Sequence, residues 1–218
     1  MEKEIDWFTR IIAILGLIIS IVATVLPYYK DISDEKELLA IDVKSEKGNS
    51  IIKISNDINK SKAIQIPYII TLTNVGKVKL SITSYNIEQI VNKNTISYFN
   101  GLDGGLFDLN NNKIVFPKII DSGESIMLRA YVGFIASKEI SEFLYKEYEK
   151  KSPIILDDIM ISLAKLGKTL YGSNATYEEF SENNYIISVD NTFINSPKYN
   201  IRFKTGKLNE FVDIFSDS

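Results

Sequence analysis

An uncharged apolar run near the N-terminus constrains this chain more than any other feature. It extends from Ile11 to Tyr29, between Arg10 and Lys30. Coiled as an α-helix, the run rises about 28 Å, close to the roughly 30 Å hydrocarbon core of a bilayer. The run therefore predicts a single transmembrane helix, with the remainder of the chain attached to it as a soluble domain.

Residues at both ends of the run fit the two membrane interfaces. Trp7 lies at its N-terminal end, and Tyr28 and Tyr29 lie at its C-terminal end. Aromatic rings with a polar atom prefer the headgroup level. The charged ends of Arg10 and Lys30 can extend outward into water. We expect these five side chains to hold the helix at the interfaces, with the lipid bilayer as a direct partner.

Three features argue against a cleaved signal peptide. The N-terminal tail, residues 1–6, mixes acidic and basic side chains, whereas a signal peptide begins with a basic region. The apolar run is longer than a usual signal core, and the bulky residues 26–29 offer no small-x-small cleavage site. We predict an uncleaved single-pass anchor, with a cleaved signal or a buried soluble helix as the alternatives.

The flanking charges do not decide the orientation of this helix. Lys3 and Arg10 precede it, and Lys30 and Lys36 follow it, so the rule that places basic residues in the cytoplasm gives a tie. The short, nearly neutral tail is easy to translocate. We therefore favour a cytoplasmic C-terminal domain.

Small residues line one side of the predicted helix. They recur at spacings of three and four, which places them on one helical face: Ala13, Gly16, Ser20, Ala23 and Thr24. A small-x-x-x-small series allows two helices to approach closely in lipid. This face predicts self-association or pairing with another membrane protein, although small residues are also common in membrane helices that do not pair.

Composition excludes several classes of chemistry. The chain has 218 residues, no cysteine and no histidine. Disulfides, thiolate catalysis, zinc sites built on Cys or His, and His-dependent triads are therefore excluded. The net charge of −3 and the scattered lysines do not indicate a nucleic-acid partner. The abundance of Ile, Asn and Lys, with few arginines, is typical of AT-rich bacterial or phage genomes.

Alternating apolar and polar residues predict strands through much of residues 39–134. The clearest strand is 64–73, and another is 125–134. We expect two hairpins, one pairing 39–44 with 52–54 and one pairing 64–73 with 78–90. Pro67 lacks an N–H, which places its part of the strand at an edge or a bulge. Residues 56–62 and 173–184 are polar and predict loops.

Two stretches have the sequence pattern of a known class of module. The phrase ITLTNVGKVKLSIT is followed later by DSGESIMLRAYVGF, and turn signals recur about every ten residues. This pattern resembles the strand–turn–strand rhythm of bacterial immunoglobulin-like modules, over about a third of the chain. The resemblance implies a β-sandwich in which two antiparallel sheets face each other.

The second half of the chain predicts helices as well as strands. Residues 137–150 have helical spacing of apolar residues after a potential cap at Ser137, which predicts an amphipathic crossover helix. Residues 153–171 fit a helix or a hairpin, and we favour strands because the surroundings are rich in β pattern. Residues 185–189 and 199–203 predict strands. Asn209 can cap a short C-terminal helix with an apolar stripe of Leu208, Phe211, Val212 and Phe215.

The sequence therefore predicts a mainly β fold. An N-terminal single transmembrane helix is followed by an immunoglobulin-like antiparallel β-sandwich with an amphipathic crossover helix and a short C-terminal helix. The expected organisation is a tail and membrane helix at 1–30, an acidic spacer at 31–37, and a β-sandwich domain at 38–218 with a helical insertion at about 137–150.

No motif in the chain predicts a reaction, a metal or a cofactor. Asp108, Asn110 and Asn112 have the spacing that opens a calcium loop, but Lys113 replaces the required glycine and Ile119 occupies the closing position. Gly167-Lys168-Thr169 lacks the upstream glycine of a phosphate-binding loop. We expect a non-catalytic module that binds a protein partner or ligand at the membrane. An oligomeric membrane effector or sensor, and an enzyme based on carboxylates or a hydroxyl, are the alternatives.

Overall fold

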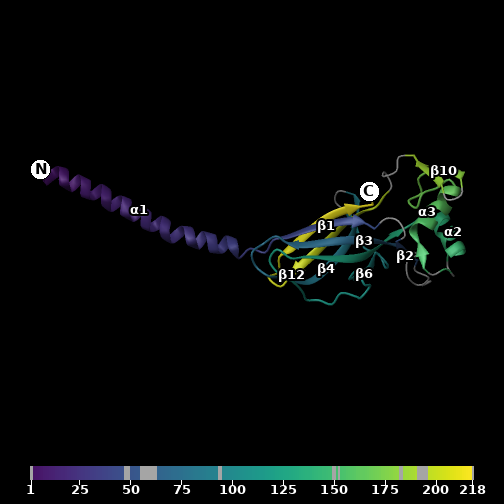
Figure 1. Ribbon diagram of the computed structural model, residues 1–218, viewed down its shortest axis with the longest axis horizontal. Coiled ribbons are helices and arrows are strands. Elements are labelled where there is room, and N and C mark those ends of the chain that lie inside the picture. Colours follow the sequence, from purple (N-terminus) through teal and green to yellow (C-terminus); the bar gives the residue numbers. More distant parts are fainter. Residues whose placement is uncertain are drawn as a thin grey trace.

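The chain forms a long helix, a central β domain and a smaller group of helices and strands in a row (Figure 1). The computed structural model describes residues 2–46, 50–54, 63–92, 95–148, 151, 153–181, 184–190 and 196–217. The long helix, α1 (Glu2–Asp34), projects from one end of the β domain, which we call the proximal end. Within α1, side chains are described from Trp7 to Pro27.

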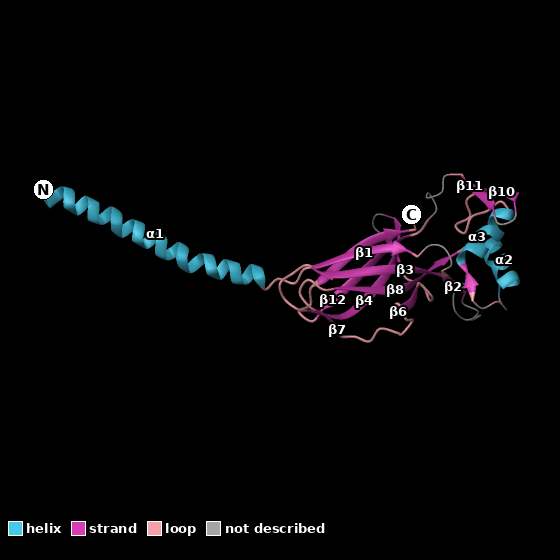
Figure 2. Ribbon diagram, in the orientation of Figure 1, coloured by secondary structure: helices cyan, strands magenta, loops and turns pink. Residues whose placement is uncertain are grey.

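The described residues are mainly β, in antiparallel sheets with three helices (Figure 2). The first sheet has the order β6-β8-β3-β2-β9, and β1 also pairs with β3. Its strands are β1 (Leu39–Ser45), β2 (Ile51–Ile54), β3 (Ala63–Asn74), β6 (Asp103–Phe107), β8 (Ser125–Ile135) and β9 (Ile154–Ile155). β3 is its central strand and runs the full length of the domain.

The second sheet has the order β13-β12-β4-β5, and β7 also pairs with β4. Its strands are β4 (Leu80–Asn92), β5 (Thr95–Ser97), β7 (Lys118–Ile120), β12 (Lys198–Thr205) and β13 (Glu210–Ser216). The C-terminal strand β13 therefore pairs with β12 and closes one edge of this sheet.

The core lies between the two sheets. Alternate residues of β3 are buried from Ile64 to Leu72, as the sequence pattern predicted, and alternate residues of β12 are buried from Tyr199 to Thr205. The ring of Tyr68 on β3 contacts the rings of Tyr199 and Phe215 on the second sheet, with centroids 6.2 and 4.9 Å apart. These edge-on aromatic contacts join the two sheets.

Both predicted hairpins are wrong, although their strands are present. β1 and β2 do not pair with each other; they pair with successive parts of the same side of β3. β3 and β4 belong to different sheets, so residues 75–79 cross from one sheet to the other. Each strand is long and apolar on one face. That face is buried equally well whether the strand pairs with a neighbour in its own sheet or packs against the opposite sheet.

Pro67 lies where the partner strand of β3 is interrupted. β1 pairs with β3 up to Tyr68, and β2 resumes the pairing at Gln65. The carbonyl of Pro67 still accepts a hydrogen bond from the Glu46 N–H (3.1 Å). The missing N–H of proline therefore coincides with an irregularity in the neighbouring strand, as expected.

The helices α2 (Lys138–Tyr148) and α3 (Leu156–Lys165) lie together at the end of the β domain opposite α1 (Figure 2). α2 confirms the predicted helix, and the Ile140 N–H donates to Ser137 Oγ (3.4 Å) at its start. Instead of lying on a sheet, α2 packs on α3. The Tyr148 hydroxyl donates to the Asp158 carbonyl (3.0 Å) and lies 2.7 Å from Ser162 Oγ.

The favoured strand interpretation of 153–171 is wrong for most of that stretch. Only Ile154 and Ile155 form a strand, and α3 follows directly. Ile159 and Leu163 are fully buried one helical turn apart. The helix ends at Lys165, and Gly167 follows it with a φ of +76° that suits glycine and an N–H that donates to the Ala164 carbonyl (2.9 Å).

The predicted C-terminal helix is also wrong. Residues Glu210–Ser216 form β13, because Phe211 and Phe215 alternate toward the core as well as recurring at helical spacing. Asn209, the expected helix cap, lies in the turn between β12 and β13. Part of the predicted loop 173–184 is a strand, β10 (Ala175–Ser181), which pairs with β11 (Asn184–Val189) in a separate hairpin. The predicted loop at 56–62 lies outside the described residues.

The β domain has its own core, to which α1 contributes nothing in its described part. Every apolar residue in the described core lies at Leu39 or later. None of the span from Trp7 to Pro27 is buried. Because the stabilising contacts of the domain are internal, we expect residues 35–218 to fold without α1.

Close backbone contact at Gly133 gives a direct test of this packing. A Cβ at this position would lie 2.1 Å from the Gly101 carbonyl oxygen, where no side chain fits. We predict that Gly133→Ala lowers the free energy of unfolding of residues 35–218 by about 1–3 kcal/mol or more, measured by urea denaturation. Gly206→Ala is the matched control, because its nearest neighbour would be at 3.7 Å. Equal stability of the two variants would contradict the packing.

Candidate membrane anchor and distal surface

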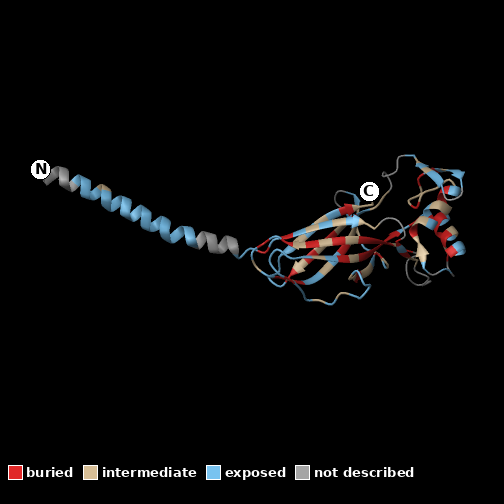
Figure 3. Cartoon of the chain, viewed as in Figure 1, coloured by how far each residue is buried: buried red, intermediate tan, exposed pale blue. Residues whose placement is uncertain are grey.

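The segment Trp7–Pro27 of α1 is long and apolar enough to cross a membrane, with a mean hydropathy of 2.4. No part of this segment is buried by the rest of the chain, and Figure 3 shows it exposed along its length. Exposed Ile and Leu side chains cover most of the helix surface outside the face that carries Gly16, Ser20 and Thr24. In water this surface would be unfavourable, since each such side chain gains about 1.5–3 kcal/mol on leaving water.

The predicted interface residues lie on α1 as the sequence analysis expected, but only some of their side chains are described. Trp7 is 66% exposed, and Arg10 is exposed one turn later. Tyr28, Tyr29 and Lys30 belong to the helical backbone of α1, and their side chains lie outside the described part of the structure.

The small-residue face of α1 is open. Nothing lies within 4 Å of the position that a Cβ would take at Gly16, and Ala13 is exposed. Ser20 Oγ donates to the Gly16 carbonyl and Thr24 Oγ1 donates to the Ser20 carbonyl, both at 2.8 Å. These bonds within the helix satisfy both hydroxyls without a second helix. Pairing of this face would therefore rest on close packing, with no need for hydrogen bonds between helices.

A buried carboxylate joins the end of α1 to the β domain. Glu37 is 7% exposed, and its Oε2 accepts hydrogen bonds from Thr205 Oγ1 and from Asn209 Nδ2 (2.9 Å). Nearby, Lys207 Nζ donates to the Glu35 carbonyl (3.3 Å). The turn between β12 and β13 thus holds the chain immediately after the helix.

Asn74 organises the same end of the domain. It is fully buried, and its Nδ2 donates to the carbonyls of Val78 (2.7 Å) and Ile120 (3.1 Å). Its Oδ1 accepts the Gly76 N–H, and the next residue, Val75, donates its N–H to the Leu38 carbonyl (3.0 Å). These bonds tie the crossing between the sheets to the segment that leaves α1.

Sequence reasoning missed this junction. The sequence predicted an acidic spacer at residues 31–37. In the structure, residues 31–34 continue α1 and Glu37 is buried. A charged residue in a polar stretch carries no local sign that it will be buried. The partners of Glu37, at positions 205 and 209, are also far away in the sequence.

At the opposite end, the hairpin of β10 and β11 exposes apolar side chains. Phe180 is 66% exposed and Ile186 is 52% exposed. The root of the hairpin is held by α3, where the Lys165 ammonium lies 4.8 Å from the ring centre of Tyr177. We call this group of α2, α3, β10 and β11 the distal cap, since Figure 1 shows it farthest from α1.

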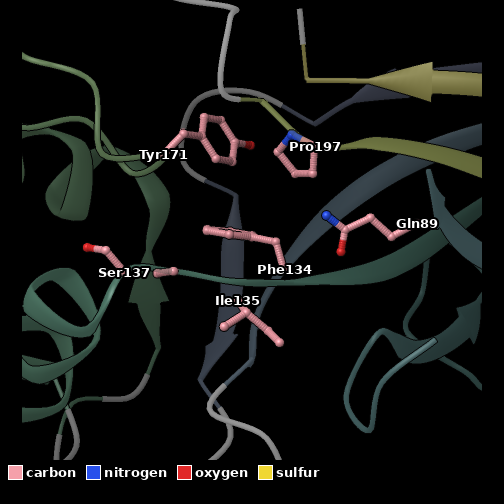
Figure 4. A pocket seen from close by; sticks show the side chains of 7 residues that line it. Gln89, Phe134, Ile135, Ser137, Tyr171 and Pro197 are labelled. Atoms are coloured by element: carbon pink, nitrogen blue, oxygen red, sulfur yellow. The ribbon is translucent and has the colours of Figure 1, made fainter. Parts of the chain in front are cut away.

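A small hollow of about 130 Å³ lies between the β domain and the distal cap (Figure 4). The rings of Phe134 and Tyr171 pack together at its centre, with centroids 5.1 Å apart. The remaining lining comes from Gln89, Ile135, Ala136, Ser137 and Pro197. Gln89, Ser137 and Tyr171 supply the polar side chains of the lining, and none of the lining residues carries a carboxylate or a basic group.

Buried tyrosines stabilise the contact between the β domain and the distal cap. The Tyr171 hydroxyl donates to Asp217 Oδ2 (2.8 Å), which connects the cap to the C-terminal strand. Burial raises the pKa of Tyr171, Tyr68 and Tyr199 well above the ordinary value, and the nearby Asp217 carboxylate adds to this shift. The three phenols therefore stay neutral at physiological pH, and none is prepared to act as a base.

One lysine lies among aromatic rings on the first sheet. Lys53 Nζ is 3.6 Å from the ring centre of Tyr131 and 4.4 Å from that of Phe107. Partial burial lowers the pKa of Lys53. The two rings, which lie nearly perpendicular to each other at 85°, stabilise the cation. Among the described residues no carboxylate forms an ion pair with Lys53, so the arrangement is a structural cation–π contact.

The Asp108 turn satisfies its own carboxylate. Asp108 Oδ1 accepts the N–H groups of Asn110 (2.9 Å) and Asn112 (2.8 Å), and Asn112 Nδ2 donates to Oδ2 (2.9 Å). The bonds from Asn112 lower the pKa of Asp108. Across the described residues, no group of three acidic side chains is placed to hold a metal ion.

No protein-family model matches this chain, and no curated protein matches its sequence. The features of the chain that bear on function are therefore the candidate anchor, its junction with the β domain, and the distal cap.

The junction at Glu37 can be tested by its effect on stability. We predict that Glu37→Ala lowers the free energy of unfolding of residues 35–218 by about 1–3 kcal/mol, because two donors lose a buried acceptor. Glu35→Ala, which removes an exposed carboxylate two residues away, should change it by about 0.5 kcal/mol or less. Urea denaturation of both variants makes the comparison, and equal effects would show that Glu37 is not a structural contact.

Proposed function

We propose that this protein is a membrane-anchored, non-catalytic β domain that binds a protein partner at the membrane surface. The observation that carries the proposal is the uncovered apolar segment Trp7–Pro27, which continues directly into a domain with its own core. Lipid is the surrounding in which such a helix is stable. In this proposal α1 spans the membrane once and the domain lies on the cytoplasmic side.

The arrangement of strands supports an immunoglobulin-like β-sandwich as the fold of this domain. Two antiparallel sheets share one core, and the chain crosses between them after β3. Sandwiches of this class present loops and strand ends at their two ends as binding surfaces. Here one end is occupied by α1, which leaves the other end for a partner.

The distal hairpin is the binding surface that we propose. Its two strands pair only with each other and are mostly exposed on both faces. A hairpin of this kind adds little to a core, whereas exposed aromatic and aliphatic side chains are typical of protein interfaces. Phe180 and Ile186 are the side chains expected to contact the partner.

A photoreactive phenylalanine analogue at position 180, in the full chain in its own cells, tests this surface. We expect a discrete crosslinked product of higher mass, and expect Ile186→Asp to abolish it by placing a charge in the interface. The same analogue at Met127, which is 50% exposed on β8, should give no product. Absence of a product from position 180, or its persistence with Ile186→Asp, would contradict the proposal. Protease added to intact cells reports on which side the domain lies.

A second candidate function is an oligomeric effector or sensor that self-associates through α1. The observation in its favour is the open face at Gly16, Ser20 and Thr24. We predict that Gly16→Ile lowers the oligomeric state in mild detergent, measured by light scattering, because the branched side chain blocks close approach. Ile19→Leu, a change elsewhere on the helix, should have no effect. An unchanged state with Gly16→Ile would remove the basis for self-association.

A further inference from the structure

We propose that the proximal end of the β domain docks into the interface of the same bilayer that α1 crosses, through the apolar side chains of Leu38, Val75 and Leu208. We call these three residues the proximal rim. The inference rests on the proposed function, since it requires α1 to span the membrane. The rim is a second contact with lipid, in addition to α1, and it fixes the orientation of the domain relative to the membrane.

The three rim residues come from separate parts of the chain and meet at the exit of α1. The Val75 N–H donates to the Leu38 carbonyl (3.0 Å), so these two residues are neighbours. Leu208 lies in the turn that holds Glu37, and the preceding residue, Lys207, contacts the Glu35 carbonyl. The rim therefore surrounds the segment that connects the helix to the domain.

All three side chains are exposed despite being apolar. Leu38 is 47% exposed, Val75 is 59% exposed and Leu208 is 72% exposed. Leu208 also has a φ of +66°, a backbone conformation that costs a residue with a side chain about 1–2 kcal/mol. Glycine or asparagine would fit this turn better, so folding gives no reason for a leucine there.

The distance from the apolar span places the rim just outside the layer of lipid headgroups when α1 stands upright. α1 continues from Pro27 to Asp34, which adds about 10 Å of helix beyond the span. The polar interface of a bilayer extends roughly 5–8 Å beyond each side of the hydrocarbon core. In the docked arrangement the helix tilts, as membrane helices do by about 20° on average and by up to about 40°, which lowers one side of the rim toward this layer.

The charged side chains around the rim are of both signs. This distribution indicates which part of the lipid the rim contacts. Lys36 and Lys207 flank the rim, but Glu35 lies among them, and Lys79 pairs with Asp121 at 2.8 Å. No single sign dominates, so attraction to anionic headgroups does not drive the contact. The occupant that fits is the apolar edge of the bilayer interface, with little dependence on headgroup charge.

Tryptophan fluorescence in the full chain tests the inference. Trp7→Phe removes the natural tryptophan, and Leu208→Trp or Val75→Trp then supplies a reporter in the rim. Leu166→Trp is the matched control, because Leu166 is 57% exposed in the distal cap. Each variant is reconstituted in phosphatidylcholine vesicles with and without bromine near the top of the acyl chains. We expect brominated lipid to quench both rim reporters and to leave the control unchanged.

A fourth variant separates docking from folding. Leu208→Asn removes the apolar side chain but suits the positive φ, so residues 35–218 should melt at the same or a higher temperature. In the full chain, Leu208→Asn should reduce the quenching of the Val75→Trp reporter. If quenching of that reporter stays the same, Leu208 does not contribute to the contact.

The remaining outcomes distinguish the inference from the proposed function. Unquenched rim reporters in protein that resists extraction by alkaline carbonate would overturn the docking and leave the anchor in place. Release by carbonate would overturn both, because α1 would not span the membrane. Quenching of Leu166→Trp to the same extent as the rim reporters would also overturn the docking, since the domain would then lie flat on the lipid.

Discussion

The apolar surface of α1 is the constraint on which the rest of the structure depends. From Trp7 to Pro27 nothing in the chain covers this helix, and each exposed Ile or Leu gains about 1.5–3 kcal/mol when it leaves water. The β domain does not use this helix in its own core, because its described core begins at Leu39. The chain thus consists of an apolar helix that the described domain leaves uncovered and a domain with its own core, and the junction between them determines how the two are related.

That junction is built from buried polar groups. Glu37 and Asn74 are buried and hydrogen-bonded to backbone and side chains of three different connections. Buried polar groups require specific partners, and their loss costs about 1–3 kcal/mol each, so they fix one geometry more strictly than apolar contacts do. A flexible linker would let the domain take any orientation at the membrane. The observed bonds instead hold the β12–β13 turn and the β3–β4 crossing beside the end of α1.

Sequence patterns predicted the elements in which apolar residues recur at a regular local spacing. They did not predict which strands pair, because pairing depends on residues far apart in the sequence. Alternation predicted β3 and β8, and a cap with helical spacing predicted α2. The partner of each strand was not predictable, because β3 can bury its apolar face with β4 beside it or across from it. Phe211 and Phe215 fit both a helix and a strand, and pairing with β12 decides for the strand. At the site, the long apolar helix could be predicted from composition alone, whereas Glu37 was assigned to a spacer and Leu208 to the apolar stripe of a helix.

The same geometry restricts what the distal cap can reach. β3 runs from the cap to the proximal end over 12 residues, which at about 3.3 Å each spans roughly 40 Å. In the proposed arrangement, with the junction near the headgroups, the β10–β11 hairpin stands at least that far from the lipid. A membrane protein that projects only short loops could not contact Phe180 or Ile186 at this height. The proposed function therefore calls for a soluble protein as the partner, or a membrane protein whose own domain extends comparably far from the bilayer.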